Sequence, residues 1–258
     1  RGLGSAVGSG VGLGPRRRLR LRRRGRGRPR RGIGRGLQDR RGRGRRVARR
    51  GQKHRIEDLS VELLVTHGAQ GFRFRELADR LGITRATIHY YYGNKQTLVD
   101  AVAVQYISSL LAQWEKNWAG DARFVDKIVG MMEANRRRYL AFNPTPATNH
   151  PWSFIGRMRV DRDVIGAEAQ AVLDGFGPTL ERFIMAALDQ AVARGEFDPD
   201  IPRSDIALQL VAIADSAGSI TQDGGGFERL DRLYRSFAHI VEHAYGAEPG
   251  KGRRGAKG

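Results

Sequence analysis

The sequence predicts an all-α fold for the part of the chain that follows residue 53. From there on, apolar residues recur three or four positions apart, as they do on one face of a helix. Turn residues divide these stretches into separate helices, for example at 143–151 and 195–202. No stretch alternates apolar and polar residues over a length that favours a β-strand. Two domains are expected in this part of the chain, 54–94 and 95–245.

Residues 1–53 differ from the rest, because they hold 21 of the chain's 46 lysines and arginines but only one of its 27 acids. An arm so rich in Arg and Gly buries too little apolar surface to fold, so it is expected to be disordered. One interpretation is a polycation that binds nucleic acid without sequence preference. The other is that the arm is not part of the native protein, since the chain begins with Arg1 rather than Met. The tail, 246–258, is expected to be flexible.

Several classes of function are disfavoured by what the sequence lacks. There is no cysteine, which excludes disulfides, zinc–thiolate sites and thiol nucleophiles. No apolar run approaches the ~18 residues that span a bilayer, so a cytoplasmic protein without a membrane partner is expected. An enzyme is not expected, because no phosphate-binding loop or metal-ligand set is visible. His239 and His243 lie four residues apart but have no third ligand in view, so no metal or cofactor is expected.

Turn and cap residues place the individual helices. The first predicted helix ends near 67–68, and the second, 74–81, is closed by Gly82. Thr84 suits the N-cap of a third helix that ends near Tyr91, and Asn94 suits the N-cap of a fourth that ends near Trp118. Further helices are predicted at about 122–142, 152–173, 178–194, 204–220 and 227–245.

Two short helices joined by a glycine turn, with another helix before them, form a helix-turn-helix layout, whose second helix can enter the DNA major groove. On a helical wheel, Ile88 and Tyr92 share the inward face. The opposite face is expected to contact DNA, although a polar face that meets only solvent is the alternative. The candidate contacts are Arg73, Thr84, Arg85, Ala86, Thr87, His89, Tyr90, Tyr91 and Lys95.

These residue types suit different parts of DNA. Arg85 can bind guanine O6 and N7 or a phosphate, and Ala86 can touch a thymine methyl group. His89 and Tyr90 offer hydrogen bonds and flat faces to base edges. The phosphates are the expected partners of Thr87, Tyr91 and Lys95, and Lys95 also begins a helix whose N–H groups attract anions.

Residues 54–100 resemble the DNA-binding domain of the tetracycline-repressor (TetR) family of bacterial regulators. The matching residues are Gly68, Arg75-Glu76-Leu77-Ala78, Gly82-Ile83-Thr84, Thr87-Ile88-His89-Tyr90-Tyr91-Tyr92, Asn94-Lys95 and Leu98. The resemblance implies a homodimeric, nucleoid-associated transcription regulator, usually a repressor, that binds an inverted-repeat operator in double-stranded DNA. Arg73 departs from the Ser or Thr that is frequent in the family, which costs an N-cap worth ~1 kcal/mol but adds a cation near the DNA backbone.

The last two predicted helices carry apolar and small residues that suit helix pairing. These are Ala207, Leu210, Ala214, Ala217, Leu230, Leu233, Phe237 and Ile240. The resemblance implies that they form a four-helix bundle across a two-fold axis, and packing within one chain is the alternative. A dimer would set two reading helices one DNA turn apart, ~34 Å.

The resemblance places an effector in the middle region, 95–200, and its composition predicts a small, mostly apolar ligand. Candidate contacts, each of which could instead belong to the core, are Trp114, Trp118, Met132, Phe142, His150, Trp152, Phe176 and Phe183. A rival function is a non-specific nucleic-acid-coating protein that acts through the basic arm, with the helical part as a dimeriser. Deletion of residues 1–53 would distinguish the two functions.

Overall fold

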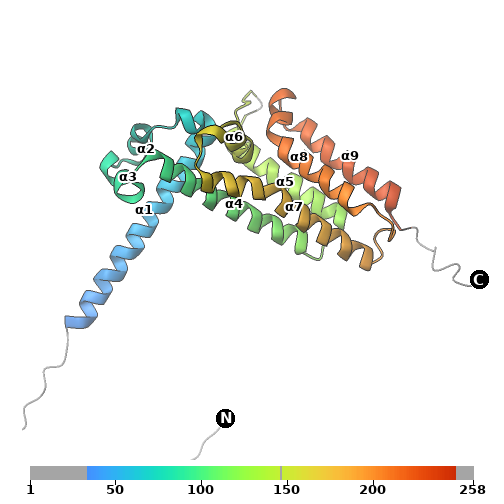
Figure 1. The fold of residues 1–258 in the computed structure, drawn as a ribbon, viewed down its shortest axis with the longest axis horizontal. Coiled ribbons are helices and arrows are strands. Elements are labelled where there is room, and N and C mark those ends of the chain that lie inside the picture. The colour runs from blue at the N-terminus through green and yellow to red at the C-terminus, as the bar shows by residue number, and fades with distance from the viewer. Residues whose placement is uncertain (1–33, 146, 248–258) are drawn as a thin grey trace, which may run out of the picture. The chain divides into compact units, whose positions relative to one another are not determined.

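The computed structural model describes residues 34–145 and 147–247, which form nine α-helices and one 3-10 turn (Figure 1). In chain order the elements are α1 (Gly34–Gly71), α2 (Phe74–Leu81), α3 (Arg85–Tyr92), α4 (Lys95–Ala119), α5 (Phe124–Phe142), α6 (Phe154–Val160), η1 (Arg162–Val164), α7 (Ala167–Ala193), α8 (Arg203–Asp223) and α9 (Glu228–Tyr245). The predicted all-α class is therefore confirmed. Within these ranges, no helix combines the length and the apolar character that crossing a membrane requires.

The first helix begins earlier than the sequence predicted. α1 starts at Gly34, so residues 34–53 are helical rather than disordered, whereas residues 1–33 lie outside the described part of the chain. Once residues 54–67 form a helix, the costly nucleation step is over and each added residue contributes one hydrogen bond. The arginines of this segment are also good helix formers. The compact unit that carries the candidate sites begins at Val47.

The predicted end of the first helix coincides with a kink. Gly68 has φ 69°, a left-handed conformation that other residues adopt only with strain, and the helix resumes briefly as far as Gly71. Close contact adds a second reason for glycine, because a Cβ at this position would lie 2.6 Å from Asp161 Oδ2. Gly68 therefore marks the point where α1 turns towards α2.

Local caps set the helix-turn-helix as the sequence predicted. α2 ends at Gly82, which adopts the left-handed conformation with φ 64°. The hydroxyl of Thr84 accepts a hydrogen bond from the Thr87 N–H at 3.2 Å and so caps α3. The side-chain oxygen of Asn94 accepts from the Thr97 N–H at 2.9 Å and caps α4. The Thr84 and Asn94 N-caps and the Gly82 C-cap are thereby confirmed.

The long helices form a bundle in which α4 packs against α7 and α5, and α7 packs against α8. α9 lies beside α5 and α8, as Figure 1 shows. α7 runs unbroken through Pro178, where the sequence predicted a turn. Its buried residues continue at helical spacing on both sides of the proline, from Leu173 and Phe176 to Leu180 and Ile184. That burial offsets the ~3 kcal/mol cost of an interior proline.

The predicted helix 152–173 is instead two helices. α6 ends at Val160, Asp161 follows it, and α7 begins only after Gly166. The interruption is held by specific contacts, because Asp100 Oδ1 accepts a hydrogen bond from the Gly166 N–H at 2.8 Å. α6 is consequently a short, separate element between α1 and the bundle core.

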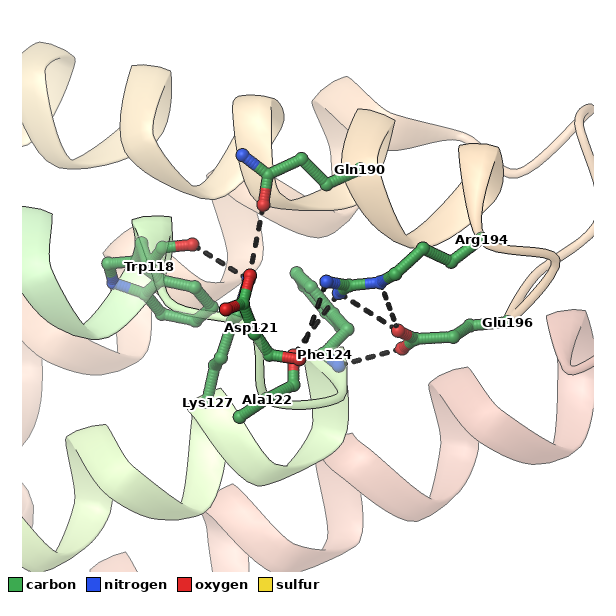
Figure 2. Close-up of polar contacts among 8 residues, drawn as sticks. All are labelled: Trp118, Asp121, Ala122, Phe124, Lys127, Gln190, Arg194 and Glu196. Atoms are coloured by element: carbon green, nitrogen blue, oxygen red, sulfur yellow. Dashed lines mark hydrogen bonds and ion pairs between the residues drawn. The ribbon is translucent and has the colours of Figure 1, made fainter.

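A buried lysine ties together the turn between α4 and α5. Figure 2 shows Lys127 beside the end of α4, and its Nζ donates to the Trp118 carbonyl at 2.8 Å. Nearby, Glu196 accepts from the Phe124 N–H at 2.8 Å and from Arg194 at 2.9 Å. Burial lowers the pKa of Lys127 from its ordinary value. A cation at a helix C-terminus is favourable, so the lysine is explained as a structural cap of α4.

Candidate DNA-binding surface and effector cavity

The inward face of α3 is the one that the sequence predicted. Ile88 is fully buried and Tyr92 is 6% exposed. The Tyr92 hydroxyl donates a hydrogen bond to Glu57 Oε1 at 2.9 Å, which joins α3 to α1. Burial, and then the bond to Glu57, raise the pKa of the Tyr92 phenol above its ordinary value. Tyr92 is therefore part of the support of the helix rather than part of its outer surface.

The outward face of α3 presents a mixed set of side chains to solvent. Arg85, Ala86, His89 and Tyr90 are exposed, and Tyr90 is 68% exposed, an unusual position for so large a ring. Tyr91 is half-buried and its ring lies edge-on to that of Tyr90 at 5.4 Å. The three consecutive tyrosines thus have three different environments, as their helical spacing predicted.

A residue that the sequence analysis did not select, Arg49, belongs to this surface. Its guanidinium lies 5.1 Å from the ring centre of Tyr90 and 5.8 Å from that of Tyr91. Such contacts hold a cation against an aromatic face. Arg49 was missed because it fell within the arm that was expected to be disordered. Arg49 comes to lie beside α3 because α1 begins well before residue 54.

His89 is oriented by two contacts. Its Nδ1 lies 2.6 Å from the Gly93 carbonyl oxygen, which can only accept, so Nδ1 carries the proton. The ring also packs edge-on against Phe74 at 5.0 Å. In the neutral imidazole, Nε2 is then left as a hydrogen-bond acceptor. This suits an amino group on a base edge, such as N4 of cytosine or N6 of adenine.

Three predicted phosphate contacts, Arg73, Thr87 and Lys95, have partners inside the protein, as does Thr84. Arg73 opens α2 without a side-chain cap, as expected, and its guanidinium donates to the carbonyls of Gln70 and Phe72. Lys95 Nζ donates to the Ala69 carbonyl at 2.9 Å. The hydroxyl of Thr84 is engaged at the N-terminus of α3, as is that of Thr87, 3.0 Å away. These side chains stabilise the turns around α3 in the free protein.

A cavity lies among the bundle helices α4, α5, α7 and α8 and the segment 152–155. Its lining residues, mostly aromatic and aliphatic, are Tyr106, Leu110, Trp114, Met131, Asn135, Arg138, Trp152, Ser153, Phe154, Ile155, Phe176 and Ala214. Three of the predicted effector contacts are thus brought together, namely Trp114, Trp152 and Phe176. The free space is only about 30 Å³, close to the volume of one water.

The other predicted effector contacts lie elsewhere. Trp118 and Met132 are buried in the core and do not line the cavity. Phe142 and His150 line a separate, more open depression beside α1. Phe183 is half-buried, with the guanidinium of Arg182 5.7 Å from its ring centre. The aromatic composition alone could not distinguish these locations.

The charged group of the cavity is Arg138, which the sequence analysis did not select. Its guanidinium lies 4.8 Å from the centre of the Trp114 ring, and Nη1 donates to Asn135 Oδ1 at 3.1 Å. Nη2 is buried and has no hydrogen-bond partner among the described residues. Burial lowers the pKa of Arg138 and raises that of Tyr106. Helical spacing could have found this arginine, because it shares a face of α5 with Met131 and Asn135.

α6 joins the cavity wall to α1. Phe154 and Ile155 of α6 line the cavity, and Asp161, which ends the helix, reaches α1. Asp161 is buried, and its Oδ2 accepts a hydrogen bond from the Ala69 N–H at 2.7 Å. The same oxygen lies 3.3 Å from Arg157 Nε. A buried hydrogen bond thus connects the end of α6 to the kink of α1.

The residues predicted to form a dimer interface fall into two groups. Five are buried within their own chain, as the alternative of intrachain packing expects: Ala207, Leu210, Ala217, Leu230 and Phe237. Ala214 is half-buried, and Leu233 and Ile240 are 37% and 58% exposed. Leu208, which was not selected, is 59% exposed. α8 and α9 each carry apolar residues on more than one face, and periodicity alone does not say which face meets the chain's own core.

Known proteins resemble the chain at two levels. Residues 56–102 match the sequence model of bacterial regulatory proteins of the tetR family. The tetracycline repressor protein class D of Escherichia coli is 38% identical over 53 residues, as is the class H protein of Photobacterium damsela subsp. piscicida. That match covers 20% of this chain and spans only 24% of the length of either relative.

Solved structures extend the likeness to most of the fold. A TetR transcriptional regulator from Chloroflexus aurantiacus has a TM-score of 0.64 at 17% identity, over 78% of this chain and 100% of that one. A regulator from Saccharomonospora viridis, solved in complex with choline, has a TM-score of 0.61 at 18% identity, over 77% and 99%. At such identities the likeness shows the fold alone. Residues 56–102 thus resemble the tetR family in sequence, and most of the chain shares the fold of solved TetR-family regulators.

Proposed function

We propose that the protein is a transcriptional repressor that binds an inverted-repeat operator as a homodimer and is released by a small-molecule effector. The observation that carries the proposal is the division of α3 into two faces. Ile88 and Tyr92 fix the helix to the domain, while Arg85, Ala86, His89 and Tyr90 face solvent. α3 follows a short helix and a tight turn, and its outer face carries these exposed side chains. Such a helix can lie in the major groove of DNA.

Dimerisation is supported by the exposed apolar side chains of α8 and α9. Leu208, Leu233 and Ile240 lie on helices that already pack against each other. Large exposed aliphatic residues on neighbouring helices are typical of an interaction surface. A two-fold pairing through them would bring two copies of α3 to the same side of an operator, whose two half-sites mirror the symmetry of the protein.

The proposed response to an effector is a shift between two conformations. A ligand that binds one conformation of the cavity better than the other favours that conformation and lowers the population that binds DNA. The hydrogen bond from Ala69 to Asp161 supplies a contact through which α6 acts on α1. The buried guanidinium of Arg138 disfavours a cation in this cavity, so the choline bound by the Saccharomonospora viridis protein is not the effector proposed here.

Selection of bound duplexes from a random pool tests the proposal. An inverted repeat whose half-site centres are about one helical turn apart is the expected result. A pool that yields no palindrome would contradict a dimeric operator-binding protein.

The same selection with residues 1–53 deleted tests the coating alternative. The regulator should keep its sequence preference and show a weaker salt dependence, whereas a coating protein should lose its binding altogether.

A further inference from the structure

We infer that the effector is a small aromatic carboxylic acid, whose carboxylate binds Arg138 inside the α4–α5–α7 bundle. The inference rests on the proposed ligand response, because it specifies the chemistry of the same cavity. It does not depend on the operator sequence or on the direction of regulation.

The charge of the cavity comes from one unneutralised cation. Arg138 makes no ion pair with an acid of the described residues, and no carboxylate lines the cavity. The neighbouring acid on α8, Asp215, lies 2.9 Å from Arg159 and is thereby paired elsewhere. A buried charge without a counterion is unfavourable. An anionic ligand would remove that penalty when it binds.

The geometry of the guanidinium selects a carboxylate. Nη1 already donates a hydrogen bond to Asn135, and the guanidinium plane packs against the ring of Trp114. These two contacts fix the orientation of the guanidinium group. Nη2 is buried and lacks a hydrogen-bond partner among the described residues, so this N–H group would gain from an acceptor. A planar carboxylate can accept from a guanidinium with short, charge-assisted bonds. A neutral ligand could accept a hydrogen bond from Nη2 but would not neutralise the charge of the guanidinium group.

The rest of the lining selects an apolar, flat body. Trp152, Phe154, Phe176 and Ile155 form much of the wall, and Ser153 adds one hydroxyl group. Aromatic walls favour offset or edge-on contact with an aromatic ring. The ligand therefore has an aromatic part against this wall and a carboxylate towards Arg138.

The size of the cavity ties binding to movement. A free volume of about 30 Å³ does not hold an aromatic ring, so the wall has to move when the ligand enters. Phe154 and Ile155 belong to α6, a helix of seven residues, and Trp152 and Ser153 directly precede it, whereas the rest of the wall comes from α4, α5, α7 and α8. α6 is the shortest of the α-helices that line the cavity. Its displacement would act on the contact between Asp161 and Ala69.

The test is a titration of the full chain with phenylacetate, 3-phenylpropionate and 1-naphthoate, each compared with its primary amide. Binding is followed by isothermal titration calorimetry, and tryptophan fluorescence provides a second readout because Trp114 and Trp152 line the cavity. At least one carboxylate should bind roughly 10- to 100-fold more tightly than its amide, the size of a hydrogen bond to a charged group. Equal binding of acid and amide, or no saturable binding of any acid at millimolar concentration, would overturn the inference.

Variants assign the preference to Arg138. Arg138→Gln should abolish the preference for the acid over the amide, and Arg138→Lys should keep part of it, because the charge remains without the planar fork. Arg137→Gln is the matched control, since Arg137 is the exposed neighbour on α5. Thermal unfolding of each variant shows whether it is folded. A preference that survives in a folded Arg138→Gln protein would refute the role of this arginine.

The outcome remains separable from that of the proposed function. Operator affinity is measured with and without the bound carboxylate. If the acid binds through Arg138 and operator affinity is unchanged, the site is supported and the proposed ligand response fails. If the selection finds no operator, the calorimetric result still decides whether Arg138 binds carboxylates.

Discussion

The Asp161 carboxylate and the Ala69 N–H form a 2.7 Å hydrogen bond that joins the end of α6 to the kink of α1. The two residues are 92 positions apart in the sequence. Asp161 also binds Arg157 of its own helix, so its orientation is fixed from both sides. A buried, charge-assisted bond of this kind is stronger than a neutral one. It connects the helix that carries Phe154 and Ile155 of the cavity wall to α1.

Replacement of Asp161 by Ala should separate the two domains functionally. The Ala69 N–H and the Arg157 guanidinium would both lose an acceptor, which should lower the free energy of unfolding by about 1–3 kcal/mol. Ligand binding in the cavity should persist, whereas the ligand-dependent change in operator affinity should shrink. Asp163→Ala, at an exposed position of η1, is the control. Parallel calorimetry and gel-shift titrations check the two effects, and an undiminished response in Asp161→Ala would count against this route.

The conformation of Gly68 leads to a paired prediction on stability. Gly68→Ala places a Cβ at φ 69° and against Arg157 and Asp161, so it should destabilise the protein by about 1–3 kcal/mol. Gly51→Ala is the control, because nothing lies within 4 Å of a Cβ there and the residue is inside α1. That change should stabilise by about 0.5–1 kcal/mol. Urea unfolding measures both, and shifts of the same sign would contradict the assigned backbone conformations.

The sequence was sufficient for the elements whose periodicity and caps agree. The inward Ile88 and Tyr92, the outward Tyr90 and the caps at Thr84 and Asn94 all follow from helical spacing and local hydrogen bonding. These are short-range properties, set by residues within about one helical turn of each other. For that reason the helix-turn-helix could be described before its structure was known.

The rest depended on contacts between distant residues. Pro178 indicated a turn locally, but burial on both sides keeps α7 continuous. The two faces of α9 could not be distinguished without knowing that α5 and α8 pack against it. Arg138 lies in a run of three arginines, and only the positions of Trp114 and Asn135 show that it faces the cavity. Tertiary packing decided each of these features.

Tyr90 and Tyr92 should respond in opposite ways to truncation. Tyr90→Ala removes a 68% exposed ring, so it should weaken specific DNA binding by about 1–3 kcal/mol while thermal stability stays close to that of the parent. Tyr92→Ala empties a buried site and should lower stability by about 2–5 kcal/mol. Competition gel shifts against the selected operator and thermal melts separate the effects. A Tyr92→Ala protein that melts like the parent would disprove the assignment of faces.

A charge on the exposed face of α9 should prevent dimerisation. Ile240→Asp places a carboxylate where we propose that apolar side chains meet across the two-fold axis, which should yield monomers at micromolar concentration. Leu140→Asp is the control, because Leu140 is also exposed, at 49%, but lies on α5. Sedimentation equilibrium gives the mass of each. If both variants remain dimeric, the interface lies on another surface.

The hydrogen bond between Tyr92 and Glu57 predicts a pH-dependent contribution to stability. Burial and this bond raise the pKa of the Tyr92 phenol in the folded state above the value of about 10 expected when unfolded. The stabilisation is then fully present below pH ~10 and is lost as the pH rises further, because the unfolded chain releases the proton first.

Tyr92→Phe should lower the free energy of unfolding by about 1–2 kcal/mol at neutral pH. Its deficit relative to the parent should narrow above pH ~10, since only the parent carries this phenol. Tyr106 and Tyr234 also have raised pKa values but are present in both proteins, so they leave the difference unchanged. Urea unfolding from neutral to alkaline pH measures the deficit, and a value that stays constant across this range would show that Tyr92 is not the titrating group.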